Sequence, residues 1–188
     1  MRLVKIGVLE RVQESEWGTP VFIIPKKEGT VCFLTDYRKV NGQIVHKLFP
    51  IPRIADTLQQ LEGFTFTTTL DLNMGYYTIP LAESSKDVTT IVTEFRKFRY
   101  TCLPMGIIIS GDVFQSKMYN LIGNIEGVKT YIDNILCIGK SSFTQHIGQL
   151  EEIFRRFHKA GLKVNAAKCS FGLKAIPYLN YIITIDGV

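Results

Sequence analysis

The sequence of 188 residues has few of the features that mark secreted, metal-stapled or membrane-spanning proteins. Its cysteines (Cys32, Cys102, Cys137 and Cys169) stand far apart, without a C-x-x-C pair or a histidine at ligand spacing, which argues against a disulfide framework or zinc site. No run of about 20 apolar residues is present, so no membrane span is expected. The N-terminal stretch has no apolar h-region, so we expect an intracellular protein, cytoplasmic or nuclear, rather than a secreted one.

The composition is sufficient for a hydrophobic core and gives a mildly basic surface. Hydrophobic residues make up 46% of the chain, which is in the globular range. The 22 Lys and Arg outnumber the 17 Asp and Glu and give a net charge of +5, which suits a polyanionic partner, although many enzymes are equally basic. The length fits one large domain or two small lobes.

A hairpin is predicted at residues 128–140, VKTYIDNILCIGK, where two apolar runs flank Asp133 and Asn134. Both residues tolerate positive φ, so we expect them to form a two-residue turn that carries a carboxylate at its tip. Asp and Asn are also ordinary turn residues, and the hairpin alone does not indicate a site. A second strand-like run, residues 66–77, contains Asp71. Two strand ends that each offer a carboxylate can form one site for a hard cation if the fold sets them side by side.

The remaining patterns predict an α+β fold. We expect a short amphipathic helix within residues 1–16, a hairpin of residues 19–25 and 31–35 with Lys26 and Lys27 near its tip, and a helix over about 52–62. Strands follow within 64–72 and 88–104, and then helices that begin near 112 and at 143. The last helix places Phe143, Ile147, Leu150, Phe154 and Phe157 on one face, with Ser142 as its cap. The order favours an antiparallel sheet of the split-βαβ type backed by helices.

Eight segments in a fixed order resemble the reverse transcriptase of gypsy-type long-terminal-repeat retrotransposons, a part of the Pol polyprotein. Each is weak alone, but together they cover essentially the whole chain at compatible spacings. They are WGTPVFIIPKKEGT, DYRKVN, FPIPRI, TLDLNMGYYTIPL, LPMG with FQ eight residues past its Gly, YIDN, HIGQLEEIFRRFHKAGLKVNAAKCSFG and YLNYIITIDG.

The resemblance implies a fingers-and-palm polymerase fold. Residues 1–65 would be mainly fingers, with about 82–104 returning to them, and residues 66–188 mainly palm. The thumb, connection and RNase H domains that follow in the family have no counterpart within these residues. The implied activity is RNA-directed DNA polymerisation on an RNA or DNA template with a primer, from deoxynucleoside triphosphates. The sequence does not indicate an oligomeric state.

The resemblance also implies two-metal nucleotidyl transfer with Mg²⁺, or Mn²⁺ as an alternative. Asp71 and Asp133 match the first two aspartates of the family's catalytic site, but Asn134 stands where the family has the third. An amide oxygen can coordinate a cation but brings no charge, and its NH₂ end repels one. We therefore expect impaired polymerisation. The alternative is a non-catalytic nucleic-acid-binding remnant or domesticated module; a metal-dependent nuclease or phosphatase is a weaker third reading.

Other roles carry over by position in the family pattern. Lys26 or Lys27 would meet the triphosphate, although both also suit a solvated turn. Arg38 and Gln115 would help to position the template strand and the nucleotide pocket, Tyr76 would lie beneath the incoming sugar, and Tyr131 would lie near the primer end. A pocket wall would include Met105 and Gly106. Further departures are Cys32, Arg96 and Asn180, where the family commonly has Arg, Gly and Gly.

Overall fold

The computed structural model describes residues 2–25, 31–46, 48–50, 63–178 and 181–184. Lys26, Lys27 and the predicted helix over 52–62 lie outside these residues. The chain divides into two compact units, each built from two separate segments. Unit 1 comprises Met1–Leu48 and Tyr76–Gly111, and unit 2 comprises Phe49–Gly75 and Asp112–Val188.

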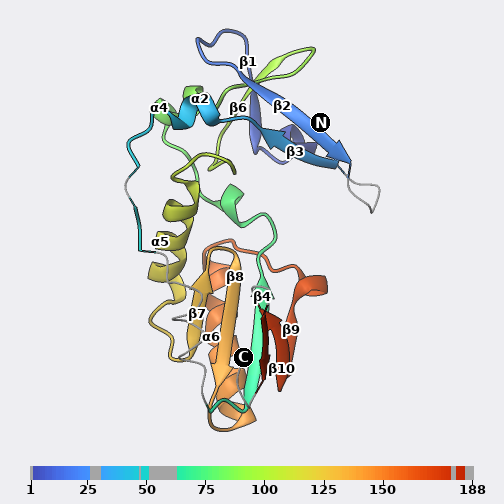
Figure 1. Cartoon of the computed structure of the whole chain (residues 1–188), viewed down its shortest axis with the longest axis vertical. Helices are drawn as coiled ribbons and strands as arrows, with labels where there is room; N and C mark the ends of the chain where they lie inside the picture. The colour runs from blue at the N-terminus through green and yellow to red at the C-terminus, as the bar shows by residue number, and fades with distance from the viewer. Residues whose placement is uncertain (1, 26–30, 47, 51–62, 179–180, 185–188) are drawn as a thin grey trace. The chain divides into compact units, whose positions relative to one another are not determined.

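Unit 1 is organised around a five-stranded sheet with the order β1-β6-β5-β2-β3 (Figure 1). The predicted hairpin is confirmed, because β2 and β3 pair from Val21↔Thr35 to Pro25↔Val31. Its strands are β1 (Leu9–Val12), β2 (Thr19–Pro25), β3 (Val31–Thr35), β5 (Ile91–Val92) and β6 (Lys97–Tyr100). Its short helical turns are α1 (Arg2–Lys5), α2 (Arg38–Asn41), α4 (Glu83–Lys86) and η2 (Asp87–Thr89), and η1 (Gly75–Thr78) begins at the boundary of the two units.

The N-terminal segment differs from its prediction. The amphipathic helix expected within residues 1–16 is only the four-residue α1, and Gly7, at φ +75°, follows it in the left-handed conformation that commonly ends a helix. The chain then forms β1, whose Leu9 pairs with Tyr100 of β6. Both side chains are buried in the core of unit 1. The helical prediction holds for Arg2–Lys5 and fails for Leu9–Val12, because pairing with a distant strand outweighs a weak local periodicity.

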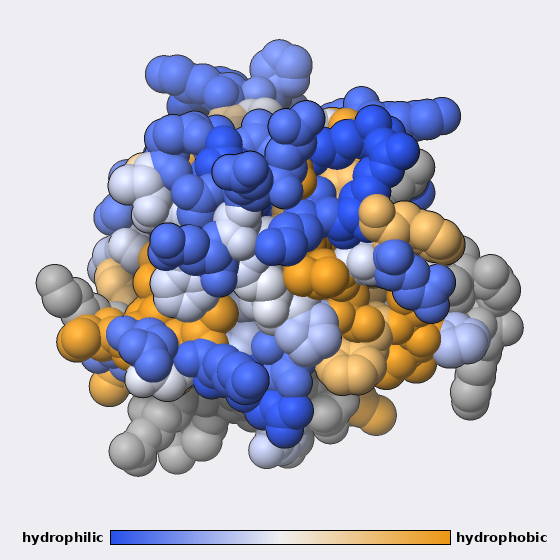
Figure 2. Space-filling model, turned by 90° about the horizontal axis from the view of Figure 1, so that it is seen from above, coloured by the Kyte–Doolittle hydropathy of each residue, from blue (hydrophilic) through white to orange (hydrophobic). Residues whose placement is uncertain are grey.

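Part of the apolar surface of unit 1 is exposed. On the β2–β3 hairpin, the exposed fractions are 53% for Phe22, 64% for Ile23 and 44% for Leu34. The face drawn in Figure 2 is largely hydrophilic but is interrupted by hydrophobic surface. The hairpin is therefore held by strand pairing more than by burial of its side chains. The buried core of unit 1 comprises Val8, Leu9, Tyr37, Val40, Ile91, Phe98, Tyr100, Cys102 and Ile107.

Unit 2 contains a four-stranded antiparallel sheet with the order β7-β8-β4-β9, and α6 packs against β8 (Figure 1). In chain order the elements run β4, α5, β7, β8, α6 and β9, which is the split-βαβ arrangement, so this prediction is confirmed. A two-stranded β10–β11 hairpin follows, and β10 contacts β4. The bounds are β4 (Phe66–Asp71), α5 (Ser110–Ile122), β7 (Val128–Tyr131), β8 (Asn134–Gly139), α6 (Phe143–Lys159), η3 (Ala166–Lys168), β9 (Ser170–Leu173), β10 (Ala175–Tyr178) and β11 (Tyr181–Thr184).

Helix α6 begins as predicted, and its buried face includes Leu150 and Phe157 of the predicted stripe but not the rest of it. Ser142 caps it by accepting a hydrogen bond from the Gln145 backbone at 3.2 Å. Two residues of the predicted stripe, Phe143 and Ile147, are 52% and 38% exposed. The buried line instead starts at a polar residue and consists of His146, Leu150, Ile153 and Phe157. The spacing of apolar residues did not reveal this face, because it begins with a polar residue. His146 is buried against the sheet, where its ring nitrogen lies 2.8 Å from the Thr68 hydroxyl. No helix in the described ranges is both long and apolar enough to cross a bilayer.

Candidate active site

Strand pairing in unit 2 brings Asp71 beside the β7–β8 hairpin. Asp71, the last residue of β4, stands opposite Asn134, the first residue of β8. Asn134 in turn pairs with Tyr131 at the end of β7. Asp133 lies in the loop between them, and its backbone carbonyl accepts a hydrogen bond from the Leu72 amide at 3.2 Å. Strand register alone therefore gathers the two predicted carboxylates and Asn134 at one end of the sheet.

The turn of this hairpin is one residue away from its predicted position. Because Tyr131 pairs with Asn134, the two loop residues are Ile132 and Asp133, not Asp133 and Asn134. Ile132 has φ +55°, and a positive φ at the first loop residue is typical of a type II′ turn. A β-branched residue rarely adopts this conformation, so local preference cannot be its cause. The shift leaves Asp133 at the tip and makes Asn134 part of the sheet.

The site is electrostatically mixed. Asn134 donates a hydrogen bond from Nδ2 to Oδ1 of Asp133 at 3.2 Å. Burial raises the pKa of the Asp133 carboxyl, a hydrogen bond from its own backbone opposes the rise, and the charge of Asp71 adds to it. Lys168 places Nζ 3.6 Å from Oδ2 of Asp71. Two acids and one amide therefore share the site with one cationic side chain.

Sequence reasoning did not identify Lys168 as a site residue. It ends η3, a short turn that carries no periodic signal. A backbone hydrogen bond from the Asn165 amide to the Asp71 carbonyl, at 2.8 Å, attaches this segment to the end of β4. This contact and the bridge between Leu72 and Val164 bring the segment of Lys168 to Asp71. No local pattern encodes such long-range contacts.

We expect Asp133→Asn to raise the melting temperature at pH 7, because it removes a carboxylate whose charged form the folded state disfavours. Because folding raises the pKa of Asp133, the protonated carboxyl contributes its full stability below the unfolded pKa of about 3.9. This contribution is lost as the pH rises through the folded pKa. The substitution removes the charge and keeps an oxygen for Asn134. Thermal denaturation with a chelator measures the gain, which should shrink as the pH falls toward about 4; an equal gain at both pH values contradicts this account.

The donor set fits a hard divalent cation, with one charge fewer than three aspartates would supply. Asp71 and Asp133 offer carboxylate oxygens, which Mg²⁺ and Mn²⁺ prefer, and Asn134 offers an amide oxygen. Over the described ranges, no cluster of three or more His, Cys, Asp or Glu side chains is arranged to hold a metal.

Among the described residues predicted to bind substrate, four belong to unit 1. Arg38 is exposed and forms a two-point ion pair with Asp36, at 2.6 Å and 2.8 Å, which lowers the pKa of that carboxyl to about 2. Gly106 has φ +97°, and its carbonyl accepts a hydrogen bond from Asn41. Met105 is exposed beside it. Tyr76 lies in η1.

Gln115 and Tyr131 belong to unit 2, as do the carboxylates. Tyr131 is partly buried at the end of β7, directly before the turn. Gln115 lies on α5 and is only 1% exposed. Its side-chain amide bonds with Thr130 and Ile132 of the hairpin, so it presents almost no surface to a substrate. The resemblance did not imply these contacts with the hairpin.

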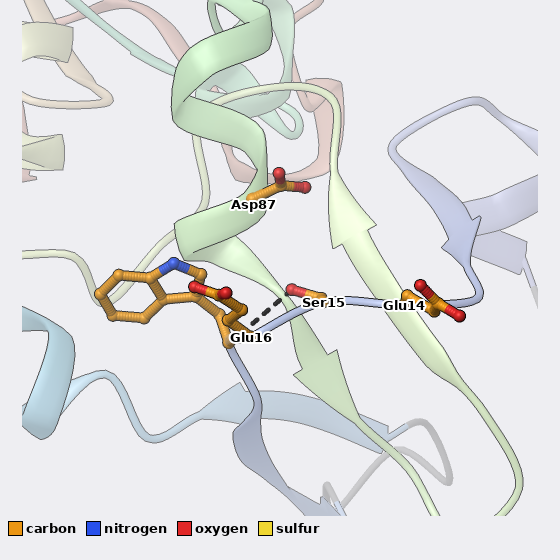
Figure 3. Close-up of a pocket in the computed structure, with 5 residues that line it drawn as sticks. Glu14, Ser15, Glu16 and Asp87 are labelled. Atoms are coloured by element: carbon orange, nitrogen blue, oxygen red, sulfur yellow. Dashed lines mark hydrogen bonds between the residues drawn. The ribbon is translucent and has the colours of Figure 1, made fainter.

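A pocket of unit 1 lies elsewhere and has the wrong charge for phosphates. Figure 3 shows Glu14, Glu16 and Asp87 around it, with the Ser15 hydroxyl accepting a hydrogen bond from the Trp17 backbone at 3.1 Å. Asp87 is already paired with Arg99 at 2.6 Å. None of these residues belongs to the predicted site, and the three carboxylates disfavour an anionic ligand.

Comparison with known proteins shows the family of this chain. Residues 24–183 match the family described as reverse transcriptase (RNA-dependent DNA polymerase). The chain belongs to this family. It is 31% identical to the Retrovirus-related Pol polyprotein from transposon 412 of Drosophila melanogaster over all of this chain and 16% of that protein. It is 30% identical to the Transposon Tf2-7 polyprotein of Schizosaccharomyces pombe over 98% of this chain and 14% of that protein. The predicted retrotransposon relationship is confirmed, and the chain spans a small part of these polyproteins.

Solved structures agree on the fold. The native Prototype Foamy Virus Protease-Reverse Transcriptase matches 97% of this chain and 24% of its own, with a TM-score of 0.90 and 30% identity. The foamy viral protease-reverse transcriptase dRH in complex with double-stranded DNA matches 98% of this chain and 32% of its own, with a TM-score of 0.92 and 28% identity. The predicted fingers-and-palm fold class is confirmed by this likeness.

Proposed function

We propose that this chain carries the polymerase site of a retrotransposon reverse transcriptase, with unit 1 as fingers and unit 2 as palm. In this proposal the segment that returns to the fingers is Tyr76–Gly111, where the sequence predicted about 82–104. The observation that carries the proposal is the register in which Asp71 faces Asn134, with Asp133 next to it. A hard-cation polymerase site requires closely placed carboxylates, and here they stand at the end of β4 and in the loop directly before β8.

Each residue of the site has a proposed part. Asp71 and Asp133 hold the metal through carboxylate oxygens, and Asn134 adds an uncharged oxygen. When bound, Mg²⁺ or Mn²⁺ supplies Lewis acidity toward the primer hydroxyl and the triphosphate. The Lys168 ammonium offsets the charge of Asp71. A hydrogen bond to Leu72 fixes the Asp133 backbone against β4 and so sets the spacing of the two acids.

The proposed substrates are a primer on an RNA or DNA template and deoxynucleoside triphosphates. Support comes from the foamy viral protease-reverse transcriptase, which has been solved with double-stranded DNA and with an RNA/DNA hybrid. Arg38, Tyr76, Met105, Gly106 and Tyr131 remain proposed substrate contacts, and Lys26 and Lys27 lie outside the described residues. The intracellular location stays a prediction.

We further propose that Asn134 impairs catalysis in this chain. Its Nδ2 group donates to Asp133, so the amide uses a carboxylate oxygen that a third aspartate would leave for a cation. This contact also favours the second candidate function, a nucleic-acid-binding module without catalysis. Binding to a primer–template that weakens steeply with salt, without extension, would support that candidate.

Metal binding tests the site directly. We expect Mn²⁺, followed by water proton relaxation, to bind the natural chain and to bind Asp71→Asn at least about 10-fold more weakly. Asp36→Asn is the matched control, because Asp36 is an acid of unit 1 paired with Arg38, and it should leave the affinity unchanged. Equal affinity in the natural chain and Asp71→Asn would contradict the site.

A further inference from the structure

Gln115 on α5 connects the helix to the catalytic turn through both ends of its amide. Its Nε2 donates to the Thr130 carbonyl at 3.0 Å and lies 3.1 Å from the Thr130 hydroxyl. Its Oε1 accepts from the Ile132 backbone amide at 2.7 Å. Gln115 and Thr130 are both buried, at 1% and 8% exposure. Bonds this short in a buried place restrict the position of the hairpin relative to α5.

The turn needs such a partner. The first loop residue of a two-residue hairpin does not donate to the ladder, so the partly buried Ile132 amide needs another acceptor. Ile132 also adopts φ +55°, a conformation that a β-branched residue keeps only when its surroundings impose it. The Gln115 oxygen supplies the acceptor. Asp133 follows directly, so the same contact restricts the position of the backbone that carries its carboxylate.

The turn is thus held from two sides. Gln115 binds the amide of Ile132 from α5, and Leu72 binds the carbonyl of Asp133 from the end of β4. Leu72 directly follows Asp71, so this hydrogen bond already links the turn to the backbone next to the Asp71 carboxylate. The Gln115 side is the one that a side-chain substitution can release.

We propose that Gln115 is a positioning residue that holds Asp133 in the orientation required for metal binding, a role that rests on the proposed function. It acts through the Ile132 peptide and does not touch the metal or a substrate. A purely structural role predicts lost stability with unchanged metal affinity. A positioning role predicts lost affinity in a chain that remains folded.

The chain provides a matched control in Gln149. This glutamine, on α6, donates from Nε2 to the Glu126 carbonyl at 2.8 Å, next to the open end of the same hairpin. Replacing either glutamine by Met keeps the length of the side chain and removes its hydrogen bonds. Gln115→Met and Gln149→Met therefore disturb the same hairpin at opposite ends, and only the first lies beside Asp133.

We expect Gln115→Met to weaken Mn²⁺ binding by about 10-fold, as loss of a supporting contact at a metal site typically does. Gln149→Met should bind like the natural chain. Thr130→Val removes the hydroxyl near Gln115 Nε2 but keeps the backbone carbonyl, so it should lose less Mn²⁺ affinity than Gln115→Met. This variant replaces Gln115→Met in the test if Gln115→Met fails to fold. Proton relaxation measures the affinity, and circular dichroism verifies folding at the titration temperature.

The outcomes separate this inference from the proposed function. If the natural chain binds Mn²⁺ and Gln115→Met binds it equally well, the positioning role is wrong and the proposed site stands. Equal losses in Gln115→Met and Gln149→Met also overturn it, because they indicate a general disturbance of the hairpin. If the natural chain itself binds no Mn²⁺, the proposed site fails, and the positioning role fails with it.

Discussion

Asn134→Asp is expected to raise the rate of primer extension on an RNA template by about 100-fold with Mg²⁺. Loss of an outer contact to a metal costs about 10–100-fold, and loss of a charged ligand costs at least as much. The two side chains have nearly the same shape, so the introduced carboxylate takes the place opposite Asp71 that register already fixes. It also ends the donation from Nδ2 to Asp133 and leaves both Asp133 oxygens for the cation.

The control is the same variant with Asp71→Asn, which should return extension to the level of the blank. Without metal, Asn134→Asp adds a third negative charge near Asp71 and Asp133, so its melting temperature should fall with a chelator and recover with Mn²⁺. If the natural chain extends a primer as fast as the variant, the amide oxygen suffices and the proposed impairment is wrong. Failure of both to extend, with Mn²⁺ bound, favours the nucleic-acid-binding module.

Gly127→Ala is expected to destabilise unit 2 by about 3 kcal/mol or more. Gly127 directly precedes β7 and has φ +73°, which costs any other residue free energy. Its carbonyl accepts a hydrogen bond from the Ile138 amide at 2.9 Å, so the two chains are already in close contact. An added Cβ would overlap the Ile138 carbonyl oxygen, a backbone atom that cannot rotate away. The open end of the hairpin would have to separate.

Gly148→Ala is the matched control for this substitution. Gly148 lies inside α6, and an added Cβ meets no atom within 4 Å. Alanine in a helix interior is favoured over glycine by about 0.5–1 kcal/mol, so this variant should be slightly more stable than the natural chain. Urea denaturation compares the two. A loss below about 1 kcal/mol for Gly127→Ala shows that the hairpin yields at its open end, contrary to the structure.

Elements with a strong local signal were predictable from the sequence. The β-branched run of β4, the two hairpins and the capped start of α6 all follow from composition and spacing. The turn position did not follow, because Asp and Asn favour turns locally while the actual loop places Ile132 at positive φ with a contact from α5. The buried face of α6 depended on a polar residue, His146, whose partner Thr68 lies in a distant strand.

The candidate site was likewise predictable only where the signal is local. Asp71 and Asp133 were identified as strand-end acids, and the resemblance supplied the role that spacing alone could not. Lys168 and the Gln115 contacts were not predicted in this form, because both arise from tertiary packing between segments that are far apart in sequence. A local pattern can place a side chain on an element, but the register between elements decides which side chains meet.

The interleaving of the two units has a consequence for dividing the protein. The backbone crosses from one unit to the other after residues 48, 75 and 111, so no single cut separates them. A fragment that begins at Asp112 keeps the hairpin with Asp133 but lacks β4, the strand between β8 and β9, and with it Asp71. A fragment that keeps both acids of unit 2 therefore needs the segment Phe49–Gly75 as well as the segment that begins at Asp112.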